Sequence, residues 1–291
     1  AEAAATPIRV ALIQPGTDPL AEAARDRGEA ALRAARLAAH VRDAVAADPA
    51  IRAVVLPEKA IEFEPWREWN RAVHELAPAL GVEVWTGGSA AEDGAGGAKR
   101  YFNSAFRLRP DGAESPRYDK NALVPFGERM PFGSALAWLS AAIGRTPFAA
   151  GDGTPLHDAL GARFAFLICY EAILPERARE PVQRGAALLV NLTYDGWFGD
   201  TAEPAQHLML VAAQAAQLGV PVLRATTTGL SAFVDARGRV VSSSALFERR
   251  ALVGDVRPLR AGGAYAAHGA WLAWGCAAAG ALLVAAGART R

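Results

Sequence analysis

The sequence predicts a layered α/β domain, and three observations lead to this class. Short runs rich in β-branched and aromatic residues alternate with longer stretches of helical composition. Polar residues stand directly where apolar runs end, which is where layered α/β folds place their chemistry. With 52% hydrophobic and 21% charged residues, the 291-residue chain has the composition of a folded protein with a sizeable core.

In the first half of the chain, proline and glycine mark the ends of the expected elements. The run Ile-Arg-Val-Ala-Leu-Ile-Gln ends at Pro15-Gly16, a second apolar run ends at Pro57, and the glycine-rich segment 93–98 predicts a turn. The last two strands of this half are expected to be adjacent around Pro110-Asp111-Gly112. The expected elements are strand 8–14, a helix that continues to about 47, strand 53–56, helix 66–80, and strands 82–87, 101–108 and 117–123.

The second half follows the same pattern. An apolar strand at 165–168 delivers Cys169 at its end, and a strand at 187–191 ends on Asn191 in the same way. A loop at 194–201 precedes the next helix. The remaining expected elements are helix 204–218 and strands 221–225, 231–235 and 252–256.

The C-terminal segment predicts a transmembrane helix over residues 261–288. It contains no lysine, arginine, aspartate or glutamate, and His268 is its only histidine. The segment reaches the ~20 residues that a helix needs to span a bilayer. Trp271 and Trp274 near one end resemble interfacial anchors, and Arg289 with Arg291 beyond the other end resembles a cytoplasmic flank. The alternative is a buried C-terminal core helix.

The domain division follows from this reading. Residues 1–6 are expected to be a linker, 7–260 a catalytic domain facing away from the cytoplasm, and 289–291 a cytoplasmic tail. Because the chain starts at Ala1 without a methionine or a signal peptide, we expect it to be cut from a longer protein.

Charge and cysteine content exclude some function classes. The formal net charge of +1 offers no basic surplus for a phosphate backbone, so nucleic acid is not expected as a partner. Cys169 and Cys276 lie in very different surroundings, and no disulfide framework is indicated. The histidines are scattered without metal-ligand spacing, and we predict no metal or other cofactor.

Cys169 is the strongest candidate for a reactive side chain. A cysteine between a buried strand and Tyr170-Glu171 is expected on a sharp connection with its sulfur exposed. A thiol needs a base or a positive neighbour to attack an acyl carbon, and Glu58 and Lys120 are the candidates for these two tasks. Each signal is weak alone, because a lone buried cysteine is usually a small hydrophobic residue.

Longer motifs strengthen this reading. Three motifs resemble the Glu, Lys and Cys motifs of the carbon-nitrogen hydrolase (nitrilase) superfamily. They are Leu56-Pro57-Glu58, Tyr118-Asp119-Lys120 with the following Leu-Val-Pro-Phe-Gly-Glu128, and Ile168-Cys169-Tyr170-Glu171. Four further motifs are similar to those of the apolipoprotein N-acyltransferase branch of this superfamily. They lie at 195–200, 206–208, 221–225 and 228–231. The similarity runs from about residue 8 to the C-terminal segment.

The resemblance implies a nitrilase-like α-β-β-α sandwich and a role for each matching residue. Glu58 would be the general base, Lys120 the oxyanion stabiliser and Cys169 the nucleophile, with a backbone N–H completing the oxyanion hole. The implied supporting residues are Glu128 as an acid beside these three, Tyr170 and Glu171 as positioning groups for the nucleophile loop, and Trp197 and Phe198 on a mobile loop near a lipid entrance.

Each supporting role has an alternative. Glu128 would otherwise form a structural ion pair, and Trp197 with Phe198 would belong to the core. Arg224 is expected in a structural salt bridge and His207 in a structural position. The sequence departs from the resembled pattern at three places, which are Lys59, Thr193-Tyr194 and Thr227.

The implied function is transfer of a fatty acyl chain from a phospholipid, through a Cys169 thioester, to the N-terminal amine of a diacylglyceryl-cysteine apolipoprotein. The implied location is the extracytoplasmic (periplasmic) face of the bacterial inner membrane, with upstream membrane helices of the same protein as partners. Two alternatives stay open: a soluble nitrilase-family amidase that uses water as acceptor, and a non-catalytic envelope interaction domain.

Overall fold

Two six-stranded sheets form the centre of the protein in a computed structural model that describes residues 6–17, 26–94, 97–129, 147–259 and 263–289. Residues 1–5 of the predicted linker and residues 290–291 of the predicted tail lie outside the described residues. The first sheet has the order β12 (Arg250–Val256), β1 (Ile8–Gln14), β2 (Ala53–Val55), β3 (Glu83–Asp93), β4 (Lys99–Leu108) and β5 (Tyr118–Asp119). The second has the order β11 (Val240–Ser243), β10 (Ala232–Val234), β9 (Val222–Thr226), β8 (Leu188–Thr193), β7 (Ala162–Ile168) and β6 (His157–Ala159).

The centre of each sheet is parallel and its edges are antiparallel. Strands β1, β2 and β3 run parallel, as do β7, β8 and β9. The carboxyl ends of parallel strands meet at one edge of a sheet, so residues that follow β2 and β7 are brought toward one end of the molecule. Strands β12, β4, β6 and β10 flank these parallel strands and pair antiparallel with them.

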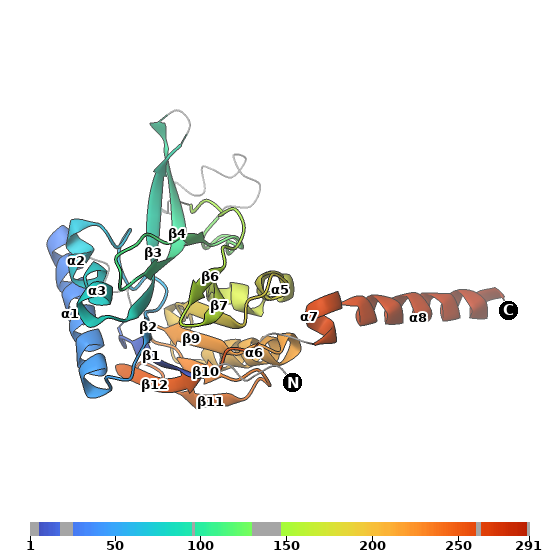
Figure 1. The fold of residues 1–291 in the computed structure, drawn as a ribbon. Coiled ribbons are helices and arrows are strands. Elements are labelled where there is room, and N and C mark those ends of the chain that lie inside the picture. The colour runs from blue at the N-terminus through green and yellow to red at the C-terminus, as the bar shows by residue number, and fades with distance from the viewer. Residues whose placement is uncertain (1–5, 18–25, 95–96, 130–146, 260–262, 290–291) are drawn as a thin grey trace.

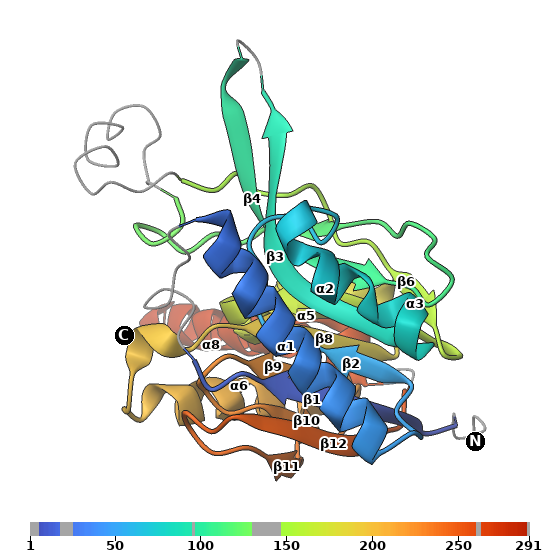
Figure 2. The ribbon, with the colours of Figure 1, turned by 90° about the vertical axis from the view of Figure 1, so that its left-hand side faces the viewer.

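Helices cover the outer face of each sheet, and the result is an α-β-β-α sandwich. Figure 2 shows α1 (Arg27–Ala47) crossing the first sheet with α2 (Arg71–His74) and α3 (Leu76–Leu80) beside it. The second sheet carries α5 (Pro175–Gln183) and α6 (Glu203–Leu218). The Asp26 side chain caps α1 by accepting the Glu29 N–H at 2.9 Å, and α6 ends at Gly219, whose φ of 68° is readily adopted by glycine.

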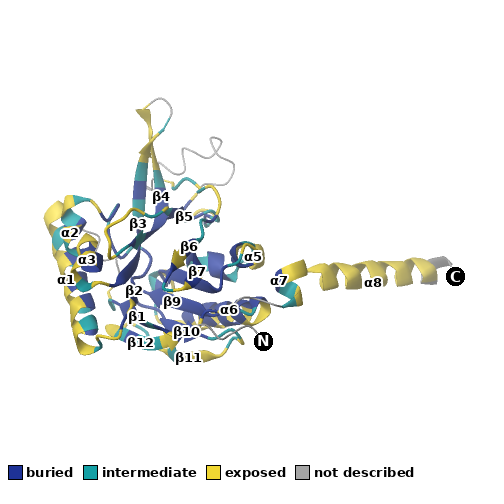
Figure 3. Cartoon of the chain, in the orientation of Figure 1, coloured by how far each residue is buried: buried dark blue, intermediate teal, exposed yellow. Residues whose placement is uncertain are grey.

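The two sheets pack against each other through a shared apolar layer. Trp85 of β3 stacks on Phe164 of β7 with ring centroids 4.3 Å apart, and both side chains are buried. Separate apolar clusters lie between the first sheet and α1, and between the second sheet and the α5–α6 pair. Figure 3 shows these buried strands between the more exposed outer helices. The predicted α-β-β-α class is therefore confirmed.

Two predicted elements differ from the structure for identifiable reasons. The strand predicted at 117–123 is only two residues long, because the N–H groups of Asn121 and Ala122 donate to the Glu171 side chain rather than to a strand. The helix predicted at 66–80 is divided into η1 (Glu68–Asn70), α2 and α3. Pro78 has no N–H to continue the helical ladder, which explains the break before α3.

Other elements were missed or shortened in the prediction. β6, β11 and α5 were not predicted, and β3 continues to Asp93, beyond the predicted end at 87. Glycine lowers strand propensity, but Gly87 is required here: a Cβ at this position would lie 2.6 Å from the Glu58 Cα. This close approach lets β3 support the Glu58 loop.

The C-terminal segment is two helices instead of the predicted single helix at 261–288. α7 (Ala264–His268) ends at Gly269, which has φ 63°, and α8 (Trp271–Arg289) then projects away from the sandwich (Figure 1). All side chains described between 271 and 286 are exposed, so the alternative of a buried core helix is wrong. Within the described ranges, no helix has the length and apolar character that a membrane crossing requires, and the transmembrane prediction is not confirmed.

Candidate active site

A cavity of about 400 Å³ opens where strands of both sheets end. It contains the side chains of Glu58, Lys120 and Cys169, the three residues predicted to do the chemistry. Glu58 follows β2, Lys120 follows β5 and Cys169 follows β7, so the cavity exists only because the two sheets are packed together. The other lining residues are Val124, Pro125, Gly127, Glu128, Tyr170, Ile173, Trp197, Phe198, Glu203 and His207.

Cys169 lies on a strained turn between β7 and the short 3₁₀ helix η4 (Cys169–Ile173). Its φ of 55° is in the left-handed region, which a residue with a side chain occupies at a cost of about 1–3 kcal/mol. The surrounding contacts hold it there: the Asn191 side-chain amide donates to the backbone carbonyls of Leu167 at 3.2 Å and of Cys169 at 3.1 Å. The turn directs the Cys169 side chain into the cavity.

The Cys169 thiol is protonated in this environment. Burial, followed by the negative charge of Glu58, raises its pKa to about 12, while Lys120 and a hydrogen bond with Thr193 act in the opposite direction. A thiol in this state needs a base that removes its proton at the moment of attack. Glu58 carries a buried oxygen, Oε2, for which no described residue provides a hydrogen-bond partner.

Lys120, Glu58 and Glu128 form a buried charged network. The Lys120 Nζ lies 2.8 Å from Glu128 Oε1 and 3.8 Å from Glu58 Oε1. Burial acts to lower the pKa of Lys120, but the negative charges of Glu58 and Glu128 outweigh it and raise the pKa. Lys120 therefore stays an ammonium group. The contacts of Glu128 are compatible with its predicted role as a supporting acid and also with the alternative role of a structural ion pair.

Asn103 joins the two carboxylates and was not predicted as a site residue. Its side-chain amide donates to Glu58 Oε1 at 2.7 Å and to Glu128 Oε1 at 3.0 Å. The available signal was a polar residue within the apolar run of β4, where it is buried. Asn103 orients Glu58 and leaves its second oxygen available.

Glu171 ties the lysine loop to the cysteine turn. It accepts the Tyr118 hydroxyl at 2.7 Å, the Ile168 N–H at 2.9 Å, and the N–H groups of Asn121 and Ala122 at 2.8 and 2.9 Å. Burial raises its pKa although these hydrogen bonds act to lower it. Tyr170 lies on the cavity wall, and the Lys120 ammonium lies 5.7 Å from the centre of its ring.

A second polar network supports the cysteine from the opposite side. Arg224 donates to Asp195 at 2.8 Å and to Asn191 at 2.7 Å, and His207 Nδ1 lies 3.2 Å from Asp195. The predicted salt bridge of Arg224 is thus confirmed. His207 is buried on α6, and burial, together with the charge of Arg224, lowers its pKa. Asn191 connects this network to the Cys169 backbone.

Trp197 and Phe198 lie at the mouth of the cavity on the 3₁₀ helix η5 (Gly196–Phe198). They are 47% and 37% exposed, so the alternative that places them in the core is wrong. With Val124, Pro125 and Ile173 they give the entrance an apolar wall. An apolar entrance beside charged groups suits a substrate with a hydrocarbon chain.

Glu203 is a cavity residue that no sequence signal indicated. It begins α6, and burial together with the charge of Asp195 raises its pKa to about 7. Asp195, Glu203 and His207 offer ligand atoms within 4.8 Å of one another among the described residues. Arg224 already neutralises Asp195 and would repel a metal cation, so we assign no ion to this group.

The fold and the cavity define an α-β-β-α protein that brings a cysteine, a carboxylate and a lysine together in one pocket. A profile of the carbon-nitrogen hydrolase family matches residues 9–264, and the chain belongs to that family.

Proteins related in sequence carry a more specific name. The chain is 35% identical over 249 residues to the apolipoprotein N-acyltransferase of Geobacter metallireducens, covering 84% of this chain and 47% of that protein. It is 36% identical over 250 residues to the apolipoprotein N-acyltransferase of Agrobacterium fabrum, covering 83% and 46%. The chain therefore spans about half the length of the curated relatives it matches.

Solved structures match the fold. The nitrilase-superfamily protein Nit3 of Saccharomyces cerevisiae superimposes with a TM-score of 0.68 at 18% identity, covering 89% of this chain and 93% of Nit3. A carbon-nitrogen hydrolase of Helicobacter pylori gives 0.66 at 18% identity, covering 86% and 88%. At this level of identity the comparison establishes the architecture alone.

Proposed function

We propose that this chain is the acyl-transfer domain of an apolipoprotein N-acyltransferase. The observation that carries the proposal is the convergence of Glu58, Lys120 and Cys169 in a cavity with an apolar entrance. The names of the bacterial relatives support N-acyl transfer to an apolipoprotein. We propose a phospholipid as the donor and a diacylglyceryl apolipoprotein as the acceptor.

In the first half of the proposed reaction the cysteine becomes acylated. Glu58 takes the thiol proton as the Cys169 sulfur attacks the ester carbonyl of the phospholipid. Lys120 and a backbone N–H stabilise the oxyanion that forms. The ester C–O bond then breaks, Glu58 returns the proton to the leaving oxygen, and a lysophospholipid departs from the thioester.

In the second half an amine replaces the sulfur. The α-amino group of the acceptor attacks the thioester carbonyl while Glu58 removes its proton. The C–S bond breaks, an amide is released, and the proton passes from Glu58 to the sulfur, which restores the thiol. The apolar wall at Trp197 and Phe198 supports binding of the acyl chain, because burial of each CH₂ group contributes about 0.8 kcal/mol.

We propose the extracytoplasmic face of the bacterial inner membrane as the site of this reaction, with further membrane helices of a longer protein as partners. The exposed apolar side chains of α8 support contact with lipid, since Trp274 is 75% exposed and Leu283 is 74% exposed.

The acyl-enzyme is the species that tests the proposed chemistry. After incubation with phosphatidylethanolamine, intact-mass measurement is expected to show one acyl adduct on the wild type and none on Cys169→Ala. Cys276→Ala is the matched control, because Cys276 is an exposed thiol outside the cavity and its removal should leave the adduct intact. An adduct that persists in Cys169→Ala would exclude Cys169 as the nucleophile.

The acceptor separates transfer from hydrolysis. When a synthetic diacylglyceryl-cysteine peptide is added to the acylated protein, the expected product is the N-acyl peptide. Release of free fatty acid at the same rate with and without the peptide would favour the amidase alternative.

A further inference from the structure

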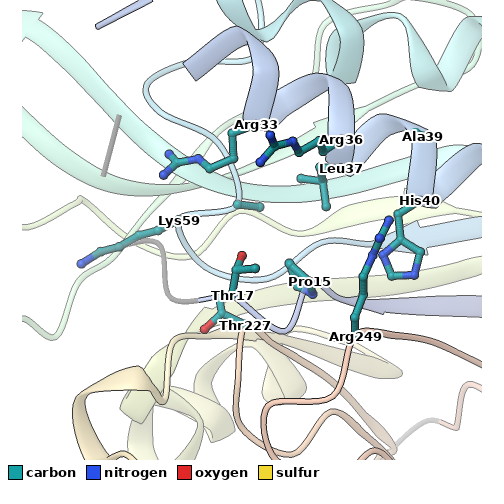
Figure 4. Close-up of a pocket in the computed structure, with 11 residues that line it drawn as sticks. Pro15, Thr17, Arg33, Arg36, Leu37, Ala39, His40, Lys59, Thr227 and Arg249 are labelled. Atoms are coloured by element: carbon teal, nitrogen blue, oxygen red, sulfur yellow. The ribbon is translucent and has the colours of Figure 1, made fainter. Parts of the chain in front are cut away.

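A second cavity, of about 360 Å³, lies between α1, the loop after β1 and the segment that precedes β12 (Figure 4). Four of its lining side chains are arginine or lysine, and His40 adds an imidazole. No aspartate or glutamate is among the described residues that line it. The cationic side chains are Arg33, Arg36, Lys59 and Arg249.

Within the described residues, only one of the four arginine and lysine side chains of this basic cavity forms an ion pair. Arg33 forms an ion pair with Glu62 at 2.7 Å. For Arg36, Lys59 and Arg249, no carboxylate of the described residues lies within ion-pair distance. Figure 4 shows the Arg249 side chain extending to His40, and burial followed by the charge of Arg249 lowers the pKa of His40. The cavity thus favours an anion over a further cation.

The floor of the basic cavity contains a hydrogen-bonding group that lacks a partner. Thr227 is 1% exposed, and its hydroxyl oxygen forms no hydrogen bond within the described part of the chain. A buried hydroxyl without a partner destabilises the folded state, and a bound ligand oxygen would remove that cost. Figure 4 shows Thr17 and Thr227 between the cationic side chains.

The loop after β1 packs closely against Thr227 and Arg249 at the base of the basic cavity. Gly16 donates its N–H to the Thr227 carbonyl at 2.9 Å and has φ 74°. A Cβ at this position would lie 2.8 Å from the Arg249 backbone nitrogen, so only glycine permits the close approach. Five segments therefore meet to form one basic cavity, namely α1, the loops after β1, β2 and β9, and the segment before β12.

We propose that the basic cavity binds a phosphate group. Phosphate offers several strong acceptor oxygens and negative charge, which match guanidinium groups that donate in pairs and a hydroxyl that donates singly. The group is either free phosphate, including a small soluble phosphate ester, or the head group of a lipid. This inference does not rest on the proposed acyl transfer.

Lys59 places the basic cavity next to the candidate active site. It follows Glu58 directly, and its ammonium lies 5.4 Å from the ring centre of Tyr194 and 5.7 Å from that of Trp197, which lines the active-site cavity. Lys59 and Thr227 are also two positions at which the sequence departs from the resembled pattern.

Calorimetric titration in chloride buffer tests the proposal with three probes: inorganic phosphate, glycerol 3-phosphate and monomeric dihexanoyl-phosphatidylglycerol. We expect at least one probe to bind with one-site stoichiometry. Arg36→Gln and Arg249→Gln should each weaken it about tenfold, because each removes a charge-assisted hydrogen bond. Thr227→Val should weaken it less.

Arg250→Gln is the matched control, since Arg250 is the exposed neighbour of Arg249 and pairs with Glu248 at 3.2 Å. Its affinity should equal that of the wild type. Binding of the short-chain lipid alone would identify a lipid head group, and binding of the soluble probes alone would identify a free phosphate or phosphate ester.

Absence of binding for all three probes would overturn the proposal, as would affinity that is unchanged in both Arg36→Gln and Arg249→Gln. Acylation of Cys169 is measured separately, so failure of phosphate binding leaves the proposed acyl transfer standing.

Discussion

The protonation states of a few side chains determine what the cavity can do. The raised pKa of Cys169 keeps its sulfur neutral at rest, and the raised pKa of Lys120 keeps its nitrogen cationic. A neutral thiol next to a fixed positive charge is stable until a carboxylate removes its proton. In the proposed reaction, the attacking thiolate therefore forms only when Glu58 acts.

Glu203 predicts a pH-dependent stability effect at the residue scale. Its pKa is raised from 4.5 to about 7, so the folded state holds this proton more tightly than the unfolded state. As pH rises from 4.5 to 7, the contribution of Glu203 to the free energy of unfolding falls progressively. Above pH 7 the full penalty of a charged carboxylate beside Asp195 remains. Glu203→Gln should therefore raise the melting temperature relative to the wild type at pH 8 and have little effect at pH 4.

Thermal unfolding at several pH values measures this difference. Glu176→Gln serves as the control, because the Glu176 side chain is 70% exposed and its replacement should shift the melting temperature little at any pH. A Glu203→Gln difference that is equal at pH 4 and pH 8 would contradict the raised pKa.

At the scale of elements, α8 is unusual because it exposes apolar side chains without packing on the sandwich. Leu282, Leu283 and Val284 are 71%, 74% and 74% exposed. Water is a poor environment for such a surface, since exposing a side chain of this size costs about 1.5–3 kcal/mol relative to full burial. The helix is therefore the part of the described structure best suited to lipid contact.

Replacing Leu282, Leu283 and Val284 together by serine should reduce co-flotation with phospholipid vesicles more than tenfold, because the summed transfer energy lost exceeds 1.4 kcal/mol. Val241→Ser on β11 is the control, as Val241 is 66% exposed on the sandwich itself. Equal flotation of the triple variant and the wild type would exclude α8 as the lipid-binding element.

At the scale of the whole molecule, the candidate active site depends on the packing of the two sheets. Glu58 and Lys120 come from the first sheet and Cys169 from the second. The buried stack of Trp85 and Phe164 lies between these sheets, and Phe166 packs edge-on against Phe164 at 5.3 Å. Stability and assembly of the site are thus coupled through one apolar layer.

Phe164→Ala tests that coupling. Loss of a fully buried ring should lower the free energy of unfolding by about 3–5 kcal/mol, as measured by chemical denaturation. Phe247→Ala, at a position that is 48% exposed, should change it by less than about 1 kcal/mol. Equal effects of the two substitutions would show that the layer between the sheets does not carry this stability.

Local sequence patterns were sufficient to predict the alternation of strands and helices and to place Glu58 and Cys169 at strand ends. Apolar runs and the proline and glycine residues that end them are local, and local patterns are readable along the chain. The motifs also supplied Lys120, Glu128, Tyr170 and Glu171 as site candidates. The same local reading extended the 117–123 strand too far, because the competing acceptor, Glu171, is distant in sequence.

The contacts between residues distant in sequence could not be predicted and are seen in the folded chain alone. Asn103 reaches Glu58 across 45 positions, and Gln14 accepts a hydrogen bond from Ser231 across 217. The basic cavity likewise joins residues from α1, the β1 loop and the segment before β12. Such contacts depend on how sheets and helices pack in space, and burial then sets the pKa of each group, so neither is encoded in any short segment of the chain.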